Sequence, residues 1–388
     1  MEQEVIQDIY RQFQHYLDEH LAIRFPPSKS GAEIRFLKHL FTPEEAELAM
    51  NLSVLPEPVD RIFNRVKESG MSSKELEKEL DTLVQKGAIM GGELTVGKNG
   101  EKQYCLAPFK LGMFEFLNFY KTLPITKDVL EAAYEYGDET FYKEFFKKDV
   151  PSQIRTIPVE KSITPEHHIS TYDNIKQIVE NLEGPIAVAK CVCRESMDVL
   201  GHPCSASDRR ETCFAFKNMA KEALKSWDAR EITKSEMLEL LDEFQELGFI
   251  LRPENNQNPT WLCSCCGDCC GNLRMVRQFS RPAEYFTSNF YAEVNPELCE
   301  GCETCVNLCQ MHALTIENKH SNVNLDLCIG CGICEANCEN GAISLIKKEK
   351  EIVPPKDQGA MYQKIMMKEK GLGGTLKMMG KMLLKKKI

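Results

Sequence analysis

One pattern of cysteines occurs twice near the carboxyl-terminal end of this 388-residue chain. Both copies have the spacing C-x2-C-x2-C-x3-C, and the second begins 29 residues after the first. The first copy consists of Cys299, Cys302, Cys305 and Cys309, and the second of Cys328, Cys331, Cys334 and Cys338. Gly301 and Leu314 recur at the same offset as Gly330 and Ile343. Because clustered thiols seldom serve as inert packing, the repeat predicts a duplicated module that binds metal.

Three cysteines at two-residue gaps let one tight loop reach three irons of a four-iron cube, and the fourth iron needs a thiolate from elsewhere. Residues 293–348 closely resemble the bacterial dicluster ferredoxins, in which that thiolate comes from the other repeat. By this resemblance, one [4Fe-4S] cluster takes Cys299, Cys302, Cys305 and Cys338, and the other takes Cys328, Cys331, Cys334 and Cys309. A zinc ribbon is the alternative, but it uses two separated pairs of ligands. The proline that usually follows the fourth cysteine is replaced by Gln310 and Glu339.

Nine further cysteines lie in the middle of the chain. The first group is Cys191, Cys193, Cys204 and Cys213, and the second is Cys263, Cys265, Cys266, Cys269 and Cys270. A further iron–sulfur centre built from a subset of both groups is the preferred interpretation, with structural zinc and a redox dithiol relay as alternatives. A single site would require Cys191 and Cys193 to meet the loop of residues 263–270, with Cys204 or Cys213 completing it. Cys105 lies in a predicted hairpin and is expected to be a core residue.

Several basic side chains flank these central cysteines: Arg194, Arg209, Arg210, Arg274, Arg277 and Arg281. They are expected to offset the negative charge of thiolate-bound metal, and binding of an anionic substrate or of a partner's carboxylates is the alternative. His167, His168 and His202 are weaker candidates for ligands, because single histidines in polar loops are usually just solvated.

The sequence predicts an α+β, multidomain protein. The expected segments are an amphipathic helical extension (1–41), a winged-helix-like domain (42–108), a helical connector and linker (109–165), a cysteine-rich central domain (166–292), the ferredoxin-like domain (293–348) and a Lys/Met-rich tail (349–388). In the amino-terminal extension, apolar residues at helical spacing, among them Phe13 and Leu17, predict a docking helix.

Residues 42–108 show three helices followed by a hairpin, an order that resembles a winged helix-turn-helix domain. Thr42 with Glu45 and Ser72 with Glu75 form capping boxes that mark helix starts. Extended pieces at 93–96 and 102–106 are joined through Lys98-Asn99-Gly100, a hairpin signal. Later in the chain, a strand at 186–189 and another boxed helix from Thr233 to Gly248 are expected.

Charge and hydropathy argue against two classes of protein. The formal net charge of -10 argues against a general nucleic-acid binder, and no run of apolar residues is long enough to cross a membrane. The polar amino terminus and the abundant cysteines favour a cytoplasmic protein whose thiols hold metal. From Lys356 onward, nine lysines and six methionines suit a peripheral membrane contact or an acidic partner.

The function expected from the sequence is electron transfer to or from a redox partner protein, with enzymatic activity left open. The order of segments resembles a group of poorly characterised iron–sulfur proteins of anaerobic microbes, which implies no particular reaction. Two alternatives stay open. One is a reductase with a substrate-binding central cluster, and the other is a redox-responsive winged-helix DNA-binding regulator, although acidic residues outnumber lysines on the third helix of that domain.

Overall fold

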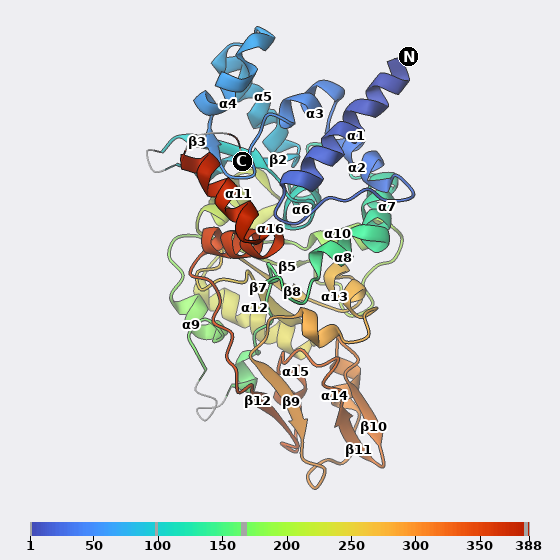
Figure 1. Ribbon diagram of the computed structural model, residues 1–388. Helices are drawn as coiled ribbons and strands as arrows, with labels where there is room; N and C mark the ends of the chain where they lie inside the picture. Colours follow the sequence, from blue (N-terminus) through green and yellow to red (C-terminus); the bar gives the residue numbers. More distant parts are fainter. Residues whose placement is uncertain (1, 98–99, 164–168, 384–386, 388) are drawn as a thin grey trace. The chain divides into compact units, whose positions relative to one another are not determined.

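The structure is a computed structural model that describes residues 2–97, 100–163, 169–383 and 387. Contacts divide the chain into two compact units, which we describe separately. Unit 1 comprises Met1–Phe145, Lys225–Asp228 and Ile365–Ile388, and unit 2 comprises Phe146–Leu224 and Ala229–Lys364. Both units combine helices with strands (Figure 1), as the predicted mixed α and β class requires.

Unit 1 is mostly helical. Its helices are α1 (Glu2–His20), α2 (Ala32–Leu40), α3 (Pro43–Ala49), α4 (Val59–Val66), α5 (Ser73–Gln85), α6 (Phe114–Tyr120), α7 (Lys127–Tyr136) and α8 (Tyr142–Phe145). Its strands β1 (Glu57–Pro58), β2 (Ile89–Val96) and β3 (Lys102–Leu106) form a sheet in the order β1-β3-β2. Phe109, between β3 and α6, stacks edge-on against Phe36 and Tyr136 at centroid distances of 5.1 and 5.0 Å. Residues 109–145, expected as part of a connector, therefore contribute to the core of this unit.

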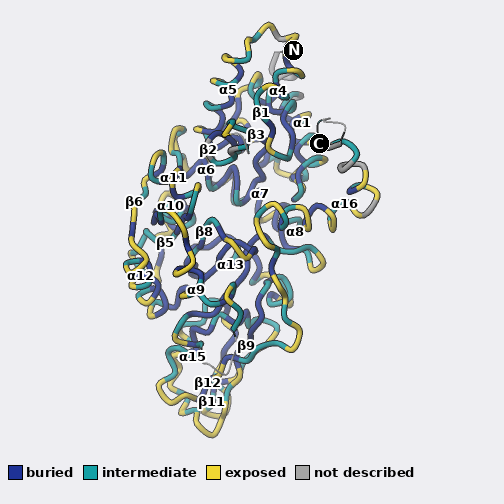
Figure 2. Tube along the Cα trace, turned by 90° about the vertical axis from the view of Figure 1, so that its left-hand side faces the viewer, coloured by how far each residue is buried: buried dark blue, intermediate teal, exposed yellow. Residues whose placement is uncertain are grey.

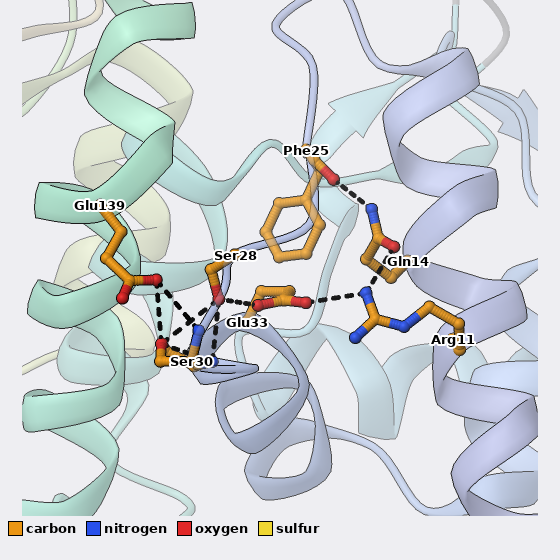
Figure 3. A network of polar contacts seen from close by, with 8 residues as sticks. Arg11, Gln14, Phe25, Ser28, Ser30, Glu33 and Glu139 are labelled. Carbon is orange, nitrogen blue, oxygen red and sulfur yellow. Dashed lines mark hydrogen bonds and ion pairs between the residues drawn. The ribbon is translucent and has the colours of Figure 1, made fainter.

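The apolar face of α1 is covered within unit 1. Phe13 and Leu17 are almost fully buried. Polar side chains of the same helix are also held in place, because Arg11 pairs with Glu33 of α2 at 2.9 Å and Gln14 donates a hydrogen bond to the carbonyl of Phe25 at 2.7 Å (Figure 3). The face that the sequence suggested for docking is thus occupied by residues of this unit.

Local sequence signals place several helix starts correctly. The capping boxes Thr42–Glu45 and Ser72–Glu75 are both present. Strand β2 begins four residues earlier than expected, and Lys98 and Asn99 of the predicted turn lie outside the described residues. Helix α12 (Lys234–Glu246) starts after Thr233, but the carboxylate of Glu236 pairs with Arg230 in place of completing the box.

Unit 2 contains a five-stranded antiparallel sheet in the order β6-β4-β5-β8-β7. The strands are β4 (Ile186–Lys190), β5 (Glu211–Phe216), β6 (Ala229–Ile232), β7 (Ile250–Pro253) and β8 (Trp261–Cys265). The associated helices are α9 (Ile175–Glu180), α10 (Val192–Val199), α11 (Lys217–Ser226), α12 and α13 (Gly271–Val276). Helix α10 follows β4 and α13 follows β8 after short connections, so both helices begin close to the sheet.

The end of unit 2 that carries the cysteine repeat has two small antiparallel pairs. Strand β9 (Phe290–Val294) pairs with β12 (Ile343–Lys347), and β10 (Leu314–Glu317) pairs with β11 (His320–Val323). Short helices α14 (Thr304–Leu308) and α15 (Ile333–Ala336) occupy equivalent places in the two repeats. In Figure 2 the tube is largely yellow around β11 and mostly dark blue along β8, so this end is the more exposed one.

The Lys/Met-rich tail forms α16 (Gln358–Leu383), with a non-helical break at Gly371. Within unit 1, Lys370 Nζ donates to the carbonyl of Glu19 at 2.6 Å, and Lys387 Nζ lies 4.6 Å from the ring centroid of Tyr16. Lys370 and Lys387 of the tail therefore make contacts with other residues of unit 1. Among the described residues, we find no helix that combines the length and the apolar composition needed to cross a bilayer.

Candidate metal centres

Two hollows in unit 2 are lined by the eight repeated cysteines. The proximal hollow is lined by Cys309, Cys328, Cys331 and Cys334. The distal hollow is lined by Cys299, Cys302, Cys305 and Cys338. Each hollow thus combines three cysteines of one motif with the last cysteine of the other. This grouping is the same as the one implied by the resemblance to dicluster ferredoxins.

Backbone amides approach several of these sulfur atoms. The amides of Ala313 and Ala342 donate to the Sγ atoms of Cys309 and Cys338 at 3.2 and 3.3 Å, and these two contacts are related by the sequence repeat. The amide of Ser321 donates to Cys299 Sγ at 3.2 Å. Hydrogen bonds from amides stabilise the thiolate form that metal binding requires, so this chain is suited to holding anionic sulfur.

The proximal hollow is apolar and shielded. Ile329 and Ile333 line it and are almost fully buried, and Ile250 of strand β7 lies in its wall. Burial raises the pKa of the Cys331 thiol to about 12 and also raises the pKa of the Cys334 thiol. Two free thiols would therefore stay protonated here at neutral pH, and a bound cation would have to displace their protons.

The distal hollow is lined by more exposed residues than the proximal one. Glu300, Glu303 and Thr304 line it and are exposed, and so is Cys302. Hydrogen bonding from the hydroxyl and the amide of Thr304 lowers the pKa of Cys302, while burial raises the pKa of Cys305. The cysteines of the distal hollow therefore include one, Cys302, that is exposed at the protein surface.

Gln310, in the lining of the proximal hollow, contacts the central cysteine loop. The amide of Gly267, between Cys266 and Cys269, donates to Oε1 of Gln310 at 2.6 Å. A side chain at Gly267 would meet the carbonyl oxygen of Gln310, and Arg277 bridges both residues through their carbonyl oxygens. Gln310 stands where ferredoxins usually have proline, which could not make this side-chain contact.

Two strands present cysteines, and a third presents an arginine, on one face of the central sheet. Cys213 of β5 is directly opposite Cys263 of β8, and Cys263 is directly opposite Arg252 of β7. Residues opposite each other in an antiparallel pair project from the same face, and so does Cys265, two residues beyond Cys263. Sheet register therefore aligns these three thiols with one arginine.

Two more segments bring thiols close to these three cysteines of the sheet. Cys191 and Cys193 lie at the start of α10, and Cys270 is the residue before α13. The Cys193 thiol contacts those of Cys191 and Cys270, and both contacts raise its pKa. The pKa of Cys270 falls well below its usual value, first through the thiols of Cys193 and Cys265 and further through the Arg252 charge. We call these residues the six-thiol group: Cys191, Cys193, Cys213, Cys263, Cys265 and Cys270.

Arg252 is the residue of this site that the sequence analysis missed. Its side chain is fully buried, and none of its three guanidinium nitrogens has a hydrogen-bond partner among the described residues. The guanidinium lies 4.7 Å from the ring centroid of Phe286. A buried, uncompensated charge costs several kcal/mol, so Arg252 indicates that an anionic group belongs beside the six-thiol group. The sequence did contain one signal for this residue, because a charged side chain directly follows the apolar residues Phe249, Ile250 and Leu251.

The remaining central cysteines form a separate, tighter set. The Sγ atoms of Cys204, Cys266 and Cys269 all lie within 4.8 Å of one another, and all three residues are buried. Cys204 and Cys266 are 3.7 Å apart at sulfur, and Nη1 of Arg194 lies 3.1 Å from Cys204 Sγ. We call these residues the three-thiol group.

Other residues proposed from the sequence make the following contacts. Arg209, Arg210 and Arg281 form ion pairs with Glu243, Asp198 and Asp326, and Arg274 lies 3.3 Å from the sulfur of Met197. His202 is exposed, and His167 and His168 lie outside the described residues. Cys105 is buried in β3, which raises its pKa to about 12.

Comparison with known proteins bears on one part of the chain. The model of a protein family described as the 4Fe-4S dicluster domain matches residues 298–343. A search of curated proteins gave no match. The matched range includes all eight cysteines that line the two hollows. Residues 298–343 are therefore a 4Fe-4S dicluster domain set within a larger chain.

Proposed function

We propose that this chain is an iron–sulfur electron-transfer protein. The observation that carries the proposal is the sorting of eight cysteines into two hollows with four thiols each, within the matched dicluster domain. When bound, a [4Fe-4S] cluster supplies one-electron redox chemistry. The protein's own contribution is to hold four thiolates per hollow in fixed loops, with backbone amides directed at sulfur.

The six-thiol group is our candidate for a further iron–sulfur centre. It offers more than the four thiolates that a cube needs, and its position beside Arg252 suits a group with net negative charge. Ile250 lines the proximal hollow and is directly opposite Cys265 in the sheet. Cys265 of the six-thiol group is thus the direct neighbour of Ile250 in the wall of the proximal hollow. This arrangement favours electron transfer between the two sites.

The distal hollow is the proposed contact for an external redox partner. Cys302 is exposed there, and exposed acidic residues surround it, including Glu297, Glu300 and Glu303. Opposite charges on two proteins steer their encounter and set orientation. We therefore propose a partner with a basic surface that docks over the distal hollow.

In unit 1, we propose that the winged-helix-like arrangement serves protein docking and not DNA reading. Lysines on and near α5 are already paired, since Lys86 contacts Glu45 and Lys102 contacts Asp81. Glu75, at the start of α5, is engaged in the capping box. Fluorescence anisotropy with duplex DNA at physiological salt should show no sequence-specific binding in either redox state, and a redox-dependent footprint would favour the regulator alternative.

Anaerobic purification followed by iron, acid-labile sulfide and zinc analysis tests the main proposal. Two cubes require about eight irons with similar sulfide, and a further cube would raise the count to about twelve. EPR of the reduced protein should resolve signals from more than one centre. Zinc with negligible sulfide would overturn the electron-transfer proposal.

A further inference from the structure

The three-thiol group differs in size from every other cysteine set in the part of the chain that the structure describes. Its three Sγ atoms lie within 4.8 Å of one another, and no three of the eight dicluster cysteines are that close. No three members of the six-thiol group meet this limit either. The described cysteines of the dicluster domain are therefore spaced more widely than those of the three-thiol group.

A single metal ion explains this compactness. In a tetrahedral zinc–thiolate site, metal–sulfur distances of about 2.3 Å place neighbouring sulfurs about 3.8 Å apart. The Cys204–Cys266 sulfur separation is 3.7 Å. In a cube, by contrast, each thiolate binds a different iron, so the ligand sulfurs must spread over a larger body. The observed separation thus fits one ion and not a cluster.

The surroundings balance the charge of such an ion. A divalent ion with three thiolates carries one net negative charge, and Arg194 supplies one positive charge through Nη1, 3.1 Å from Cys204 Sγ. The side chain of Arg194 is buried above the ring of Phe249 at 4.2 Å, and its Nη2 has no partner among the described residues. The same residue fixes the loop after Cys204 by donating to the carbonyl of Arg209 at 3.2 Å.

The described residues offer no fourth protein ligand within the same reach. The closest carboxylate, that of Asp268, has Oδ2 3.9 Å from Cys269 Sγ, and this oxygen already accepts a hydrogen bond from the amide of Ser205 at 2.6 Å. Asp268 also contacts the Cys204 thiol, but it is not part of the compact set.

We propose that Cys204, Cys266 and Cys269 bind a single Zn²⁺ ion, separate from the iron–sulfur centres, whose fourth position is open to a small non-protein ligand. An ion with three protein ligands and one exchangeable position is the arrangement found at catalytic zinc. The site does not depend on electron transfer by the dicluster domain, so the two proposals fail separately.

Zinc K-edge X-ray absorption of the full-length, anaerobically purified protein tests the site, because it detects zinc without interference from iron. The expected result is one zinc per chain, with about three sulfur neighbours at about 2.3 Å and one lighter neighbour. Four sulfur neighbours would overturn the open position. Absence of zinc from protein that holds its iron would overturn the site itself.

Variants locate the ion. Cys204→Ser and Cys269→Ser come from different loops, and each should lose the zinc while iron and sulfide stay at wild-type levels. Cys213→Ser, in the six-thiol group, should keep the zinc, and Cys105→Ser, a buried cysteine of unit 1, should keep all metals. Unchanged dicluster EPR signals would show that each variant is folded. Loss of iron and sulfide in place of zinc from the Cys204 and Cys269 variants would show that these thiols belong to a cluster.

Discussion

The proximal and distal hollows arise from one duplicated sequence but have different surroundings. Position 303 is an exposed glutamate in the left-handed region, with φ of 65°. The equivalent position in the second repeat is Gly332, with φ of 77°, where any side chain would collide with the buried Ser162. The backbone conformation at this position is similar in both repeats, and the covering differs. The same loop position is therefore covered beside the proximal hollow and exposed beside the distal hollow.

The same asymmetry appears after the last cysteine of each motif. Gln310 holds the Gly267 amide of the central loop, whereas Glu339, the equivalent residue of the second repeat, is exposed. Burial differs in the same sense, because Ile333 follows Gly332 on the shielded side and Thr304 follows Glu303 on the open side. An inward-facing site and an outward-facing site are the properties that a relay between a partner and a central centre needs.

The largest effect that tests this comparison is expected at Gly332. Changing Gly332→Glu gives the second repeat the residue found in the first, but the new side chain must displace Ser162 and bury a carboxylate. Overpacking and left-handed strain together should destabilise unit 2 by about 3 kcal/mol or more. Chemical denaturation followed by circular dichroism and visible absorbance measures this loss. A variant as stable as wild type would show that the proximal repeat is not packed as described.

A smaller effect is expected at Gln310. Gln310→Ala removes the acceptor of the Gly267 amide, and an unsatisfied buried amide costs about 1–3 kcal/mol. The matched change Glu339→Ala should alter stability by less than about 0.5 kcal/mol, because that side chain is exposed. The same denaturation experiment compares the two alanines. Equal effects at the two positions would remove the distinction between the proximal hollow, which is docked on the central loop, and the distal hollow, which is not.

The smallest effect is expected at Glu303. Glu303→Gly relieves left-handed strain of about 1–2 kcal/mol but increases the freedom of the unfolded chain, so the net gain should be below about 1 kcal/mol. Iron content should not change, since the side chain does not bear a ligand atom for the cube. A clear loss of stability would mean that Glu303 makes a contact that the open surface does not provide.

Local signals in the sequence were enough for much of the fold. The cysteine spacing marks the dicluster domain, because its ligands lie within short loops and the repeat confirms their register. Thr42 and Ser72 mark helix starts, since a capping box involves only residues three positions apart. The helix from Thr233 was also found, although Glu236 pairs with Arg230, a contact to the neighbouring strand that spacing does not reveal.

The arrangement of the central cysteines could not be predicted in the same way. Their division into six and three depends on the register that sets Cys213 opposite Cys263, and on the loop that returns Cys204 to Cys266. These contacts join residues far apart in sequence, so the order of cysteines along the chain does not reveal them. The role of Gln310 was likewise hidden, because its partner, Gly267, lies in another segment.

The assignment of the eight cysteines to two hollows is the central claim, and EPR of three single variants tests it most directly. Cys309 belongs to the first motif but lines the proximal hollow together with Cys331 of the second. Cys309→Ser should therefore perturb the same signal of the reduced protein as Cys331→Ser, while Cys302→Ser should perturb the other signal. If the spectrum of Cys309→Ser changes in the same way as that of Cys302→Ser, the cysteines do not interlock and the account of an inward and an outward site is wrong.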